Sequence, residues 1–82
     1  MFIECSIEND LNEIIELNEV YAIRKRGGED NYLIVFYVTH GKDSPVSWHY
    51  GNNKDARDSD YEELRSFVRT HKLGMDNLSE IK

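Results

Sequence analysis

Cysteine, proline and long apolar runs are scarce in this chain of 82 residues, which has one cysteine, Cys5, and one proline, Pro45. A single cysteine excludes an intrachain disulfide, so a reducing, cytoplasmic setting is expected. The first residues, MFIECSIEND, have neither a basic start nor a long apolar run, and no signal peptide is predicted. No stretch approaches the roughly 20 apolar residues that span a bilayer, so the sequence predicts no membrane contact.

Positive charge is also scarce. The chain has ten lysines and arginines and sixteen aspartates and glutamates, so its net charge is −6. Nucleic-acid binding normally leaves a basic footprint, and this balance argues against it. An acidic chain is instead steered towards basic partners, which predicts the basic surface of another protein as the binding partner. The chain is long enough for one core only. We therefore expect a single domain over residues 1–74, followed by a short tail or extra helical turn over 75–82.

Alternating apolar and polar residues predict strands in the first part of the chain. FIECSI (2–7) places Ile3, Cys5 and Ile7 on one face. For the next stretch we favour two strands, 13–17 and 20–26, with Asn18 and Glu19 at a tight turn between them. A helix over 10–18 remains the alternative, because Leu11, Ile14 and Ile15 also fit a helical stripe and Asp10 could cap it.

The clearest strand in the sequence is YLIVFYV (32–38), which is preceded by the turn-forming pair Gly27 and Gly28. Seven apolar or aromatic residues in succession indicate a central strand covered on both faces. The next strand is VSWHYG (46–51). Its alternation directs Trp48 towards the core and His49 the opposite way.

A C-terminal amphipathic helix follows from the sequence Ser59-Asp60-Tyr61-Glu62, which has the pattern of a capping box at a helix start. The predicted buried face contains residues at i, i+3, i+4 and i+7 spacing, which are Tyr61, Leu64, Phe67, Val68 and His71. The helix is expected to end at Gly74, since glycine suits the left-handed position that closes a helix.

The predicted fold is α+β, an antiparallel β-meander of four to five strands packed against one C-terminal amphipathic helix. The succession NEVYAIRK, YLIVFYV, VSWHYG and RDSDYEEL, over about residues 13–70, resembles small acidic proteins encoded by phages and other mobile elements. Some of these have a pleckstrin-homology-like sheet, and some inhibit bacterial defence systems. The resemblance is one of pattern and supplies no signature motif, so it assigns no functional residue.

Candidate catalytic and metal sites are weak in this sequence. His40, Asp43 and His49 flank one predicted hairpin, but their spacing matches no known metal-ligand frame. Cys5 alternates in phase with two isoleucines, which is typical of a small buried thiol rather than a nucleophile. Gly27 and Gly28 lack the ending of a phosphate loop. We therefore predict no catalytic residue, no metal and no cofactor.

Candidate binding residues form two groups of opposite charge. The basic group is Arg24, Lys25 and Arg26, near one end of a predicted hairpin, with Trp48 and His49 as neighbouring rings. The acidic group lies at and before the predicted helix start and consists of Asp55, Asp58, Asp60, Glu62 and Glu63. The acidic residues also suit a helix start for electrostatic reasons alone, and the basic triplet also suits an exposed strand end.

The leading functional hypothesis is a small acidic inhibitor or adaptor, of the phage-encoded kind, that occupies a basic groove on a host defence or nucleic-acid-binding protein. The alternative is a nucleic-acid or phospholigand module that uses Arg24, Lys25 and Arg26, with Tyr32, Trp48 or His49 for stacking. A metal-dependent hydrolase is the third hypothesis. The apolar surplus of the central strand further predicts a two-fold homodimer, with docking of the tail residues Met75, Leu78 and Ile81 as the competing explanation.

Overall fold

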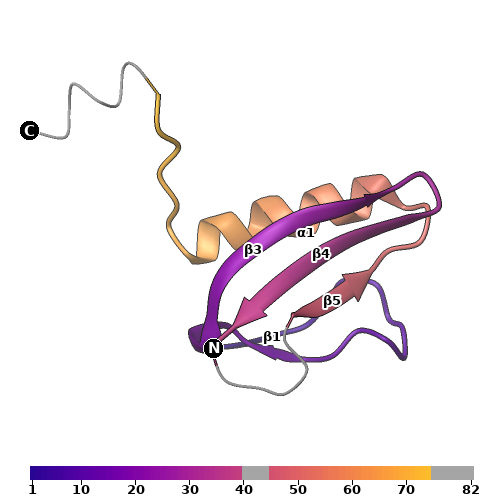
Figure 1. Cartoon of the computed structure of the whole chain (residues 1–82), viewed down its shortest axis with the longest axis horizontal. Coiled ribbons are helices and arrows are strands. Elements are labelled where there is room, and N and C mark those ends of the chain that lie inside the picture. The colour runs from indigo at the N-terminus through magenta and orange to yellow at the C-terminus, as the bar shows by residue number, and fades with distance from the viewer. Residues whose placement is uncertain (40–44, 75–82) are drawn as a thin grey trace, which may run out of the picture.

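The computed structural model describes residues 1–39 and 45–74, and these residues form two antiparallel sheets and one α-helix (Figure 1). The elements in chain order are β1 (Phe2–Ile3), β2 (Ile15–Glu16), the short 3-10 helix η1 (Leu17–Glu19), β3 (Val20–Gly28), β4 (Asn31–Val38), β5 (Val46–His49) and α1 (Lys54–Phe67). The predicted α+β class is confirmed, and the strands divide between a β1–β2 pair and a β3–β4–β5 sheet.

Strand β4 lies at the centre of the larger sheet, as predicted, and pairs with β3 on one side and β5 on the other. The turn between β3 and β4 contains Glu29 and Asp30, and the pair Gly28 and Asn31 flanks it. Gly27 has a φ of +89°, and a Cβ there would collide with the backbone carbonyl of Asn31. Glycine is therefore required at this position.

The helix begins earlier than the capping box predicts, at Lys54 rather than near Ser59. The N-cap is Asn53, whose side-chain oxygen accepts a hydrogen bond from the backbone N–H of Ala56 at 3.1 Å. Ser59 therefore lies inside the helix, and the capping-box prediction is wrong. Asp55 is the acidic residue of the first turn, where a negative charge favours the helix dipole.

The helix also ends earlier than predicted, at Phe67 instead of Gly74. Arg69, with a φ of +51°, takes the left-handed conformation just beyond the end. The predicted buried face is correct at Leu64, which is 4% exposed, but Phe67 and Val68 are 46% and 42% exposed. His71 lies outside the helix and is exposed.

The N-terminal segment is less regular than the sequence predicts. Of residues 2–7 only Phe2–Ile3 is a strand, and it pairs antiparallel with Ile15–Glu16. Residues 10–18 contain no α-helix, which agrees with the favoured strand interpretation. The expected tight hairpin at Asn18 and Glu19 is wrong, since these residues belong to η1, which joins β2 in one sheet to β3 in the other.

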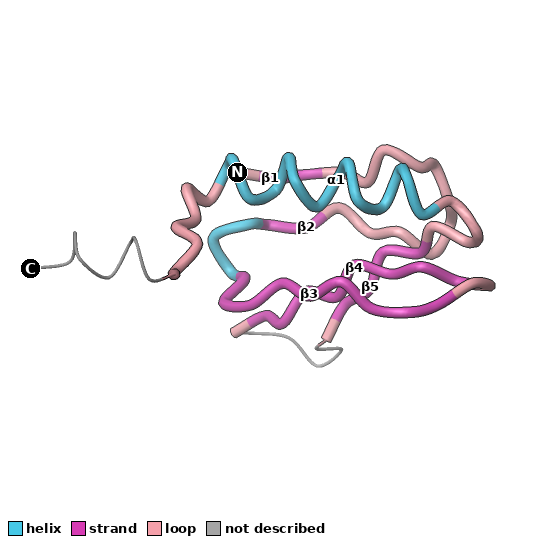
Figure 2. The backbone as a smooth tube through the Cα atoms, turned by 90° about the horizontal axis from the view of Figure 1, so that it is seen from above, coloured by secondary structure: helices cyan, strands magenta, loops and turns pink. Residues whose placement is uncertain are grey.

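The core lies on one face of the β3–β4–β5 sheet, where α1 and the β1–β2 pair lie side by side (Figure 2). Ile34, Phe36 and Trp48 are at most 1% exposed. Four further residues complete the core, Ile3, Ile15, Tyr50 and Leu64. The predicted inward direction of Trp48 is confirmed, and its ring packs edge-on against Phe36 with 4.7 Å between ring centroids.

The sheet has a second face that no described residue of the helix layer covers (Figure 2). We call it the open face. It follows from the strand alternation and register, and consists of Ala22, Arg24, Arg26, Leu33, Val35, Tyr37, Ser47 and His49. Val35 lies on this face and is 7% exposed, but it does not belong to the core cluster. The expectation that β4 is covered on both faces is therefore wrong for the described part of the chain.

The outer edge of β5 is held by the N-terminal segment. The side-chain amide of Asn12 accepts a hydrogen bond from the backbone N–H of His49 at 2.6 Å and donates one to the His49 carbonyl at 3.0 Å. Next to it, the indole N–H of Trp48 donates to the carbonyl of Glu13 at 2.8 Å. The segment before β2 therefore closes this edge of the sheet.

No helix of the described residues is long and apolar enough to cross a membrane. Residues 75–82, with the tail residues Met75, Leu78 and Ile81, lie outside the described residues. The division into a domain over 1–74 and a tail over 75–82 stays a prediction.

Candidate functional site

The basic triplet is divided between the two faces of the sheet, because successive strand residues alternate. Arg24 and Arg26 belong to the open face, while Lys25 is on the helix side. There the Lys25 ammonium lies 5.1 Å from the ring centroid of Tyr61 and 4.0 Å from a carboxylate oxygen of Asp58. The triplet therefore contributes two cations to the open face, and the third stabilises the contact with α1.

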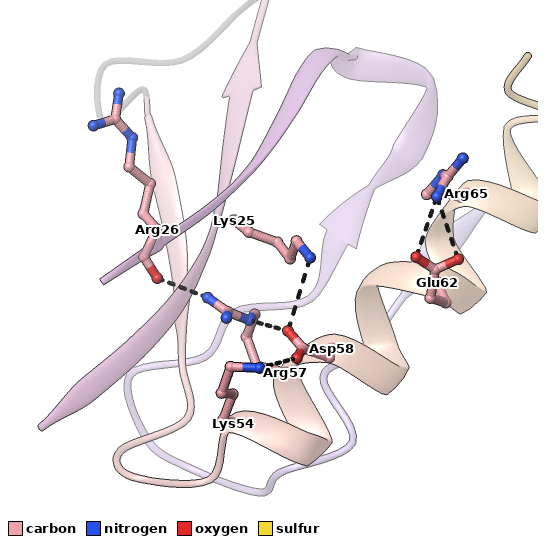
Figure 3. A network of polar contacts seen from close by, with 7 residues as sticks. All are labelled: Lys25, Arg26, Lys54, Arg57, Asp58, Glu62 and Arg65. Carbon is pink, nitrogen blue, oxygen red and sulfur yellow. Dashed lines mark hydrogen bonds and ion pairs between the residues drawn. The ribbon is translucent and has the colours of Figure 1, made fainter. Parts of the chain in front are cut away.

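A further cation, Arg57, is buried beneath the β3–β4 hairpin (Figure 3). It was not among the candidate residues from the sequence. Its guanidinium donates to the backbone carbonyl of Arg26 at 2.9 Å and to Asp58 at 2.7 Å, and lies 5.0 Å from the ring centroid of Tyr32. Arg57 therefore covers one side of the Tyr32 ring, which leaves less of it for stacking on a nucleic acid.

Asp58 of α1 lies between three cations, Lys54 and Arg57 of the same helix and Lys25 of β3 (Figure 3). It accepts hydrogen bonds from Lys54 at 2.9 Å and from Arg57 at 2.7 Å, and Lys25 is within 4.0 Å. The hydrogen bonds from Lys54 and Arg57 lower the pKa of Asp58 from its usual 3.8 to about 2, and the same pairing raises the pKa of Lys54. Asp58 thus pairs with two cations of its own helix and contacts β3 through Lys25.

Asp60 fastens the N-terminal segment to the helix. One of its oxygens accepts hydrogen bonds from the Tyr50 hydroxyl at 2.7 Å and from the Ser6 hydroxyl at 2.8 Å. The backbone N–H of Ser6 and the Cys5 thiol, at 3.1 and 3.8 Å, point at the same oxygen. Burial raises the pKa of the Tyr50 phenol and of the Cys5 thiol, so both groups stay protonated donors at neutral pH.

The remaining carboxylates of the acidic group are at the surface of α1. Glu62 forms an ion pair with Arg65 at 3.2 Å, one turn along the helix. Asp55 and Glu63 are exposed and have no side-chain partner among the described residues. Because Asp58, Asp60 and Glu62 are all held by internal contacts, the helix presents a weaker acidic surface than its sequence predicts.

The two ring candidates of β5 have different environments. Trp48 is 1% exposed and belongs to the core, so it is unable to contact a ligand. His49 is half-buried on the open face, where a ring nitrogen lies 3.2 Å from the side-chain nitrogen of Asn31. Of the pair, only His49 stays a binding candidate.

The open face combines apolar and aromatic groups with cations. A register shift between Val20 and Ala22 makes Tyr21 an extra residue in β3, and its ring lies 6.3 Å from that of Tyr37. Tyr21 is 67% exposed, and the guanidinium groups of Arg24 and Arg26 bind no described residue. Sequence reasoning missed Tyr21, because strict alternation would place it on the other face and a bulge has no dependable sequence signal.

A metal centre finds little support. Among residues 1–39 and 45–74, no group of three or more histidine, cysteine or acidic side chains is placed to hold a metal. The candidates His40 and Asp43 lie outside the described residues.

Near the N-terminus, a shallow depression of about 290 Å³ borders Cys5, Ser6 and Asn12. The Cys5 thiol there is protonated and pairs with Asp60, so it lacks the thiolate character of a nucleophile.

A groove with a volume of about 260 Å³ lies between β3 and the C-terminal half of α1. We call it the edge groove. Its walls are mostly apolar, with Val20, Tyr21 and Ile23 on the strand side and Tyr61 and Val68 on the helix side.

Comparison of the chain with protein-family models, with curated proteins and with solved structures finds no match.

Proposed function

We propose that the protein is a non-catalytic adaptor or inhibitor that binds another protein with its open face. The observation that carries this proposal is the asymmetry of the sheet. One face packs against α1 and the β1–β2 pair, and the opposite face presents Tyr21, Leu33 and Tyr37 beside Arg24 and Arg26, whose guanidinium groups bind no described residue. Aromatic and arginine side chains at the centre of a patch are the usual anchors of protein interfaces.

The partner surface that fits the open face is acidic with an apolar centre. Arg24 and Arg26 supply the charge, since both guanidinium groups are exposed and bind no described residue. This reverses the sequence-based expectation of a basic partner. Asp58, Asp60 and Glu62 all form contacts within the protein. The helix therefore offers fewer unpaired carboxylates to a basic partner than the sequence indicates. Origin in a phage and inhibition of a defence protein remain predictions from the sequence resemblance.

The nucleic-acid alternative loses three of its six candidate residues in the fold. Lys25 contacts Asp58 and Tyr61, Trp48 is in the core, and Tyr32 stacks against Arg57. Arg24, Arg26 and His49 remain, which are few groups to contact the successive phosphates that dominate nucleic-acid affinity. A protein partner is therefore the proposal, and binding of single-stranded nucleic acid is an outcome of its test.

The test compares Arg24→Glu with Arg69→Glu. Both residues are exposed and both substitutions change the net charge by the same amount, but Arg69 lies beyond the end of α1, away from the open face. Proteins that bind the immobilised wild-type chain from a lysate of its own cells are identified by mass spectrometry, and the partner is purified. We expect Arg24→Glu to weaken binding to that partner about tenfold, and Arg69→Glu to change the affinity by less than about twofold.

Two results would contradict the proposal. Equal affinities of the Arg24→Glu and Arg69→Glu variants for the purified partner would show that the open face is not the contact surface. Binding of a single-stranded oligonucleotide that Arg24→Glu abolishes, and that weakens steeply with salt, would favour the nucleic-acid alternative instead.

A further inference from the structure

Within residues 1–39 and 45–74, the outer edge of β3 has backbone hydrogen-bonding groups that bind no other residue. Tyr32 of β4 directs its N–H to Gly51 and accepts at its carbonyl from Tyr50, so both groups point away from β3. In an antiparallel pair these directions alternate along the strand, and the β4 residues Leu33 and Val35 therefore direct their groups to β3. In β3, Arg26 and Arg24 lie opposite Leu33 and Val35, so the backbone N–H and C=O groups of these two arginines point towards β4.

The β3 residues between these pairs consequently face outward. Ile23 and Lys25, which are opposite Phe36 and Ile34, direct their N–H and C=O groups to the outer edge. No described residue donates to or accepts from them there. At the opposite edge of the sheet, the outward N–H and C=O groups of His49 in β5 bind the side-chain amide of Asn12. Among the described residues, the β5 edge therefore has a hydrogen-bonding partner at His49, and the β3 edge has none at Ile23 and Lys25.

The edge groove lies beside this free edge. Val20 and Ile23 of β3 form one wall, and Tyr61 of α1 and Val68, the residue that follows the helix, form the other. A strand added to β3 would direct alternate side chains into the groove, towards α1, and the remaining ones to the open face, beside Arg24 and Arg26. The set on the helix side meets the mostly apolar walls of the groove together with Lys25, and the set on the open side meets Arg24 and Arg26.

We propose that the edge groove binds an extended segment of a partner protein in which apolar and acidic residues alternate, by addition as a fourth strand to β3. The apolar residues enter the groove and the acidic residues pair with Arg24 and Arg26. Charge argues against a second copy of this chain as the occupant. Antiparallel pairing of two β3 strands would bring two copies of the triplet Arg24, Lys25 and Arg26 together, and like charges across strands are destabilising.

This site is additional to the proposed function, because it uses the strand edge and the groove rather than the open face alone. The probe is a synthetic peptide with the sequence Glu-Val-Glu-Val-Glu-Val-Glu, blocked at both ends. We expect a Kd below about 1 mM by fluorescence anisotropy, and no binding when lysine replaces every glutamate. A version with methylated backbone nitrogens on the edge-facing residues should also fail, since it lacks the donors for the strand edge.

Amide hydrogen exchange measured by NMR locates the bound peptide. In the free protein the N–H groups of Ile23 and Lys25 should exchange quickly and that of Arg24 slowly, and the peptide should slow the first two at least about tenfold. Val68→Asp should weaken peptide binding about tenfold or more, because it places a negative charge in the groove. Ser66→Asp, on the exposed side of the same helix, should leave the affinity unchanged.

Three outcomes would overturn the inference. These are a Kd above about 1 mM for the acidic peptide, equal effects of Val68→Asp and Ser66→Asp, and slow exchange at Ile23 and Lys25 in a free protein of twice the monomer mass. The last would identify a second copy as the occupant. Val68 is not part of the open face, so failure of the peptide test leaves the effect of Arg24→Glu on the purified partner intact, and the two proposals fail separately.

Discussion

Replacing Arg57 by methionine should destabilise the fold more than any exposed ion pair of the helix could. The guanidinium is 6% exposed and donates to the Arg26 carbonyl at 2.9 Å. A hydrogen bond from a charged group contributes about 1.5–3 kcal/mol, and the contact with the Tyr32 ring adds about 0.5–1 kcal/mol. Methionine retains the apolar stem and removes a buried charge, which offsets part of this loss. Asp58 keeps Lys54 as a partner, so no buried charge is left unpaired. We expect a net loss of about 2 kcal/mol.

Urea unfolding followed by the fluorescence of Trp48 measures this loss, because the chain has one tryptophan and it is buried. With an m-value of about 1 kcal/mol/M, the midpoint should fall by about 2 M. The control is Arg65→Met, which removes an exposed pair with Glu62 and should cost less than about 0.5 kcal/mol. Equal midpoints for the two variants would refute the assigned role of the buried guanidinium.

Two further predictions concern the carboxylates of the helix. Asp58 has a folded-state pKa of about 2 against a usual 3.8, so its contribution to stability is present above pH 3.8 and is lost as the pH falls towards 2. Asp58→Asn should therefore lower the urea midpoint at pH 6, and the difference from wild type should shrink below pH 3.8 and vanish below about pH 2; an undiminished difference there would contradict the pairing. Tyr50→Phe removes the hydroxyl that donates to Asp60 and should cost about 1 kcal/mol in urea unfolding, whereas Tyr37→Phe, on the open face, should cost less than about 0.5 kcal/mol. Equal costs for the two tyrosines would argue against a structural role of the Asp60 contact.

The strands of the larger sheet could be predicted because their alternation is strong. The direction of Trp48 and the central place of β4 both follow from a period of two and from apolar content. The helix start could not be predicted, because the sequence contains two competing caps. Asn53 and Ser59 both have the local chemistry of an N-cap. The earlier start prevails in a fold where Arg57, one turn inside it, reaches the β3–β4 hairpin.

The candidate site was predictable in part. Strict alternation along β3 already separates Lys25 from Arg24 and Arg26, so the division of the triplet was available from the sequence. The contacts that occupy Asp60 were not, because Ser6 is 54 residues away in the chain. The position of Tyr21 depends on a bulge, and nothing in the residues around it indicates that irregularity.

The side chain of Asn12 has a consequence for how far any assembly through the sheet can grow. Its amide presents to His49 the same donor and acceptor that a neighbouring strand would present. Propagation of a sheet from molecule to molecule requires two free edges on each, and here a side chain takes the place of a strand at one of them. If a partner strand joins β3 as proposed, we therefore expect a one-to-one complex rather than a filament.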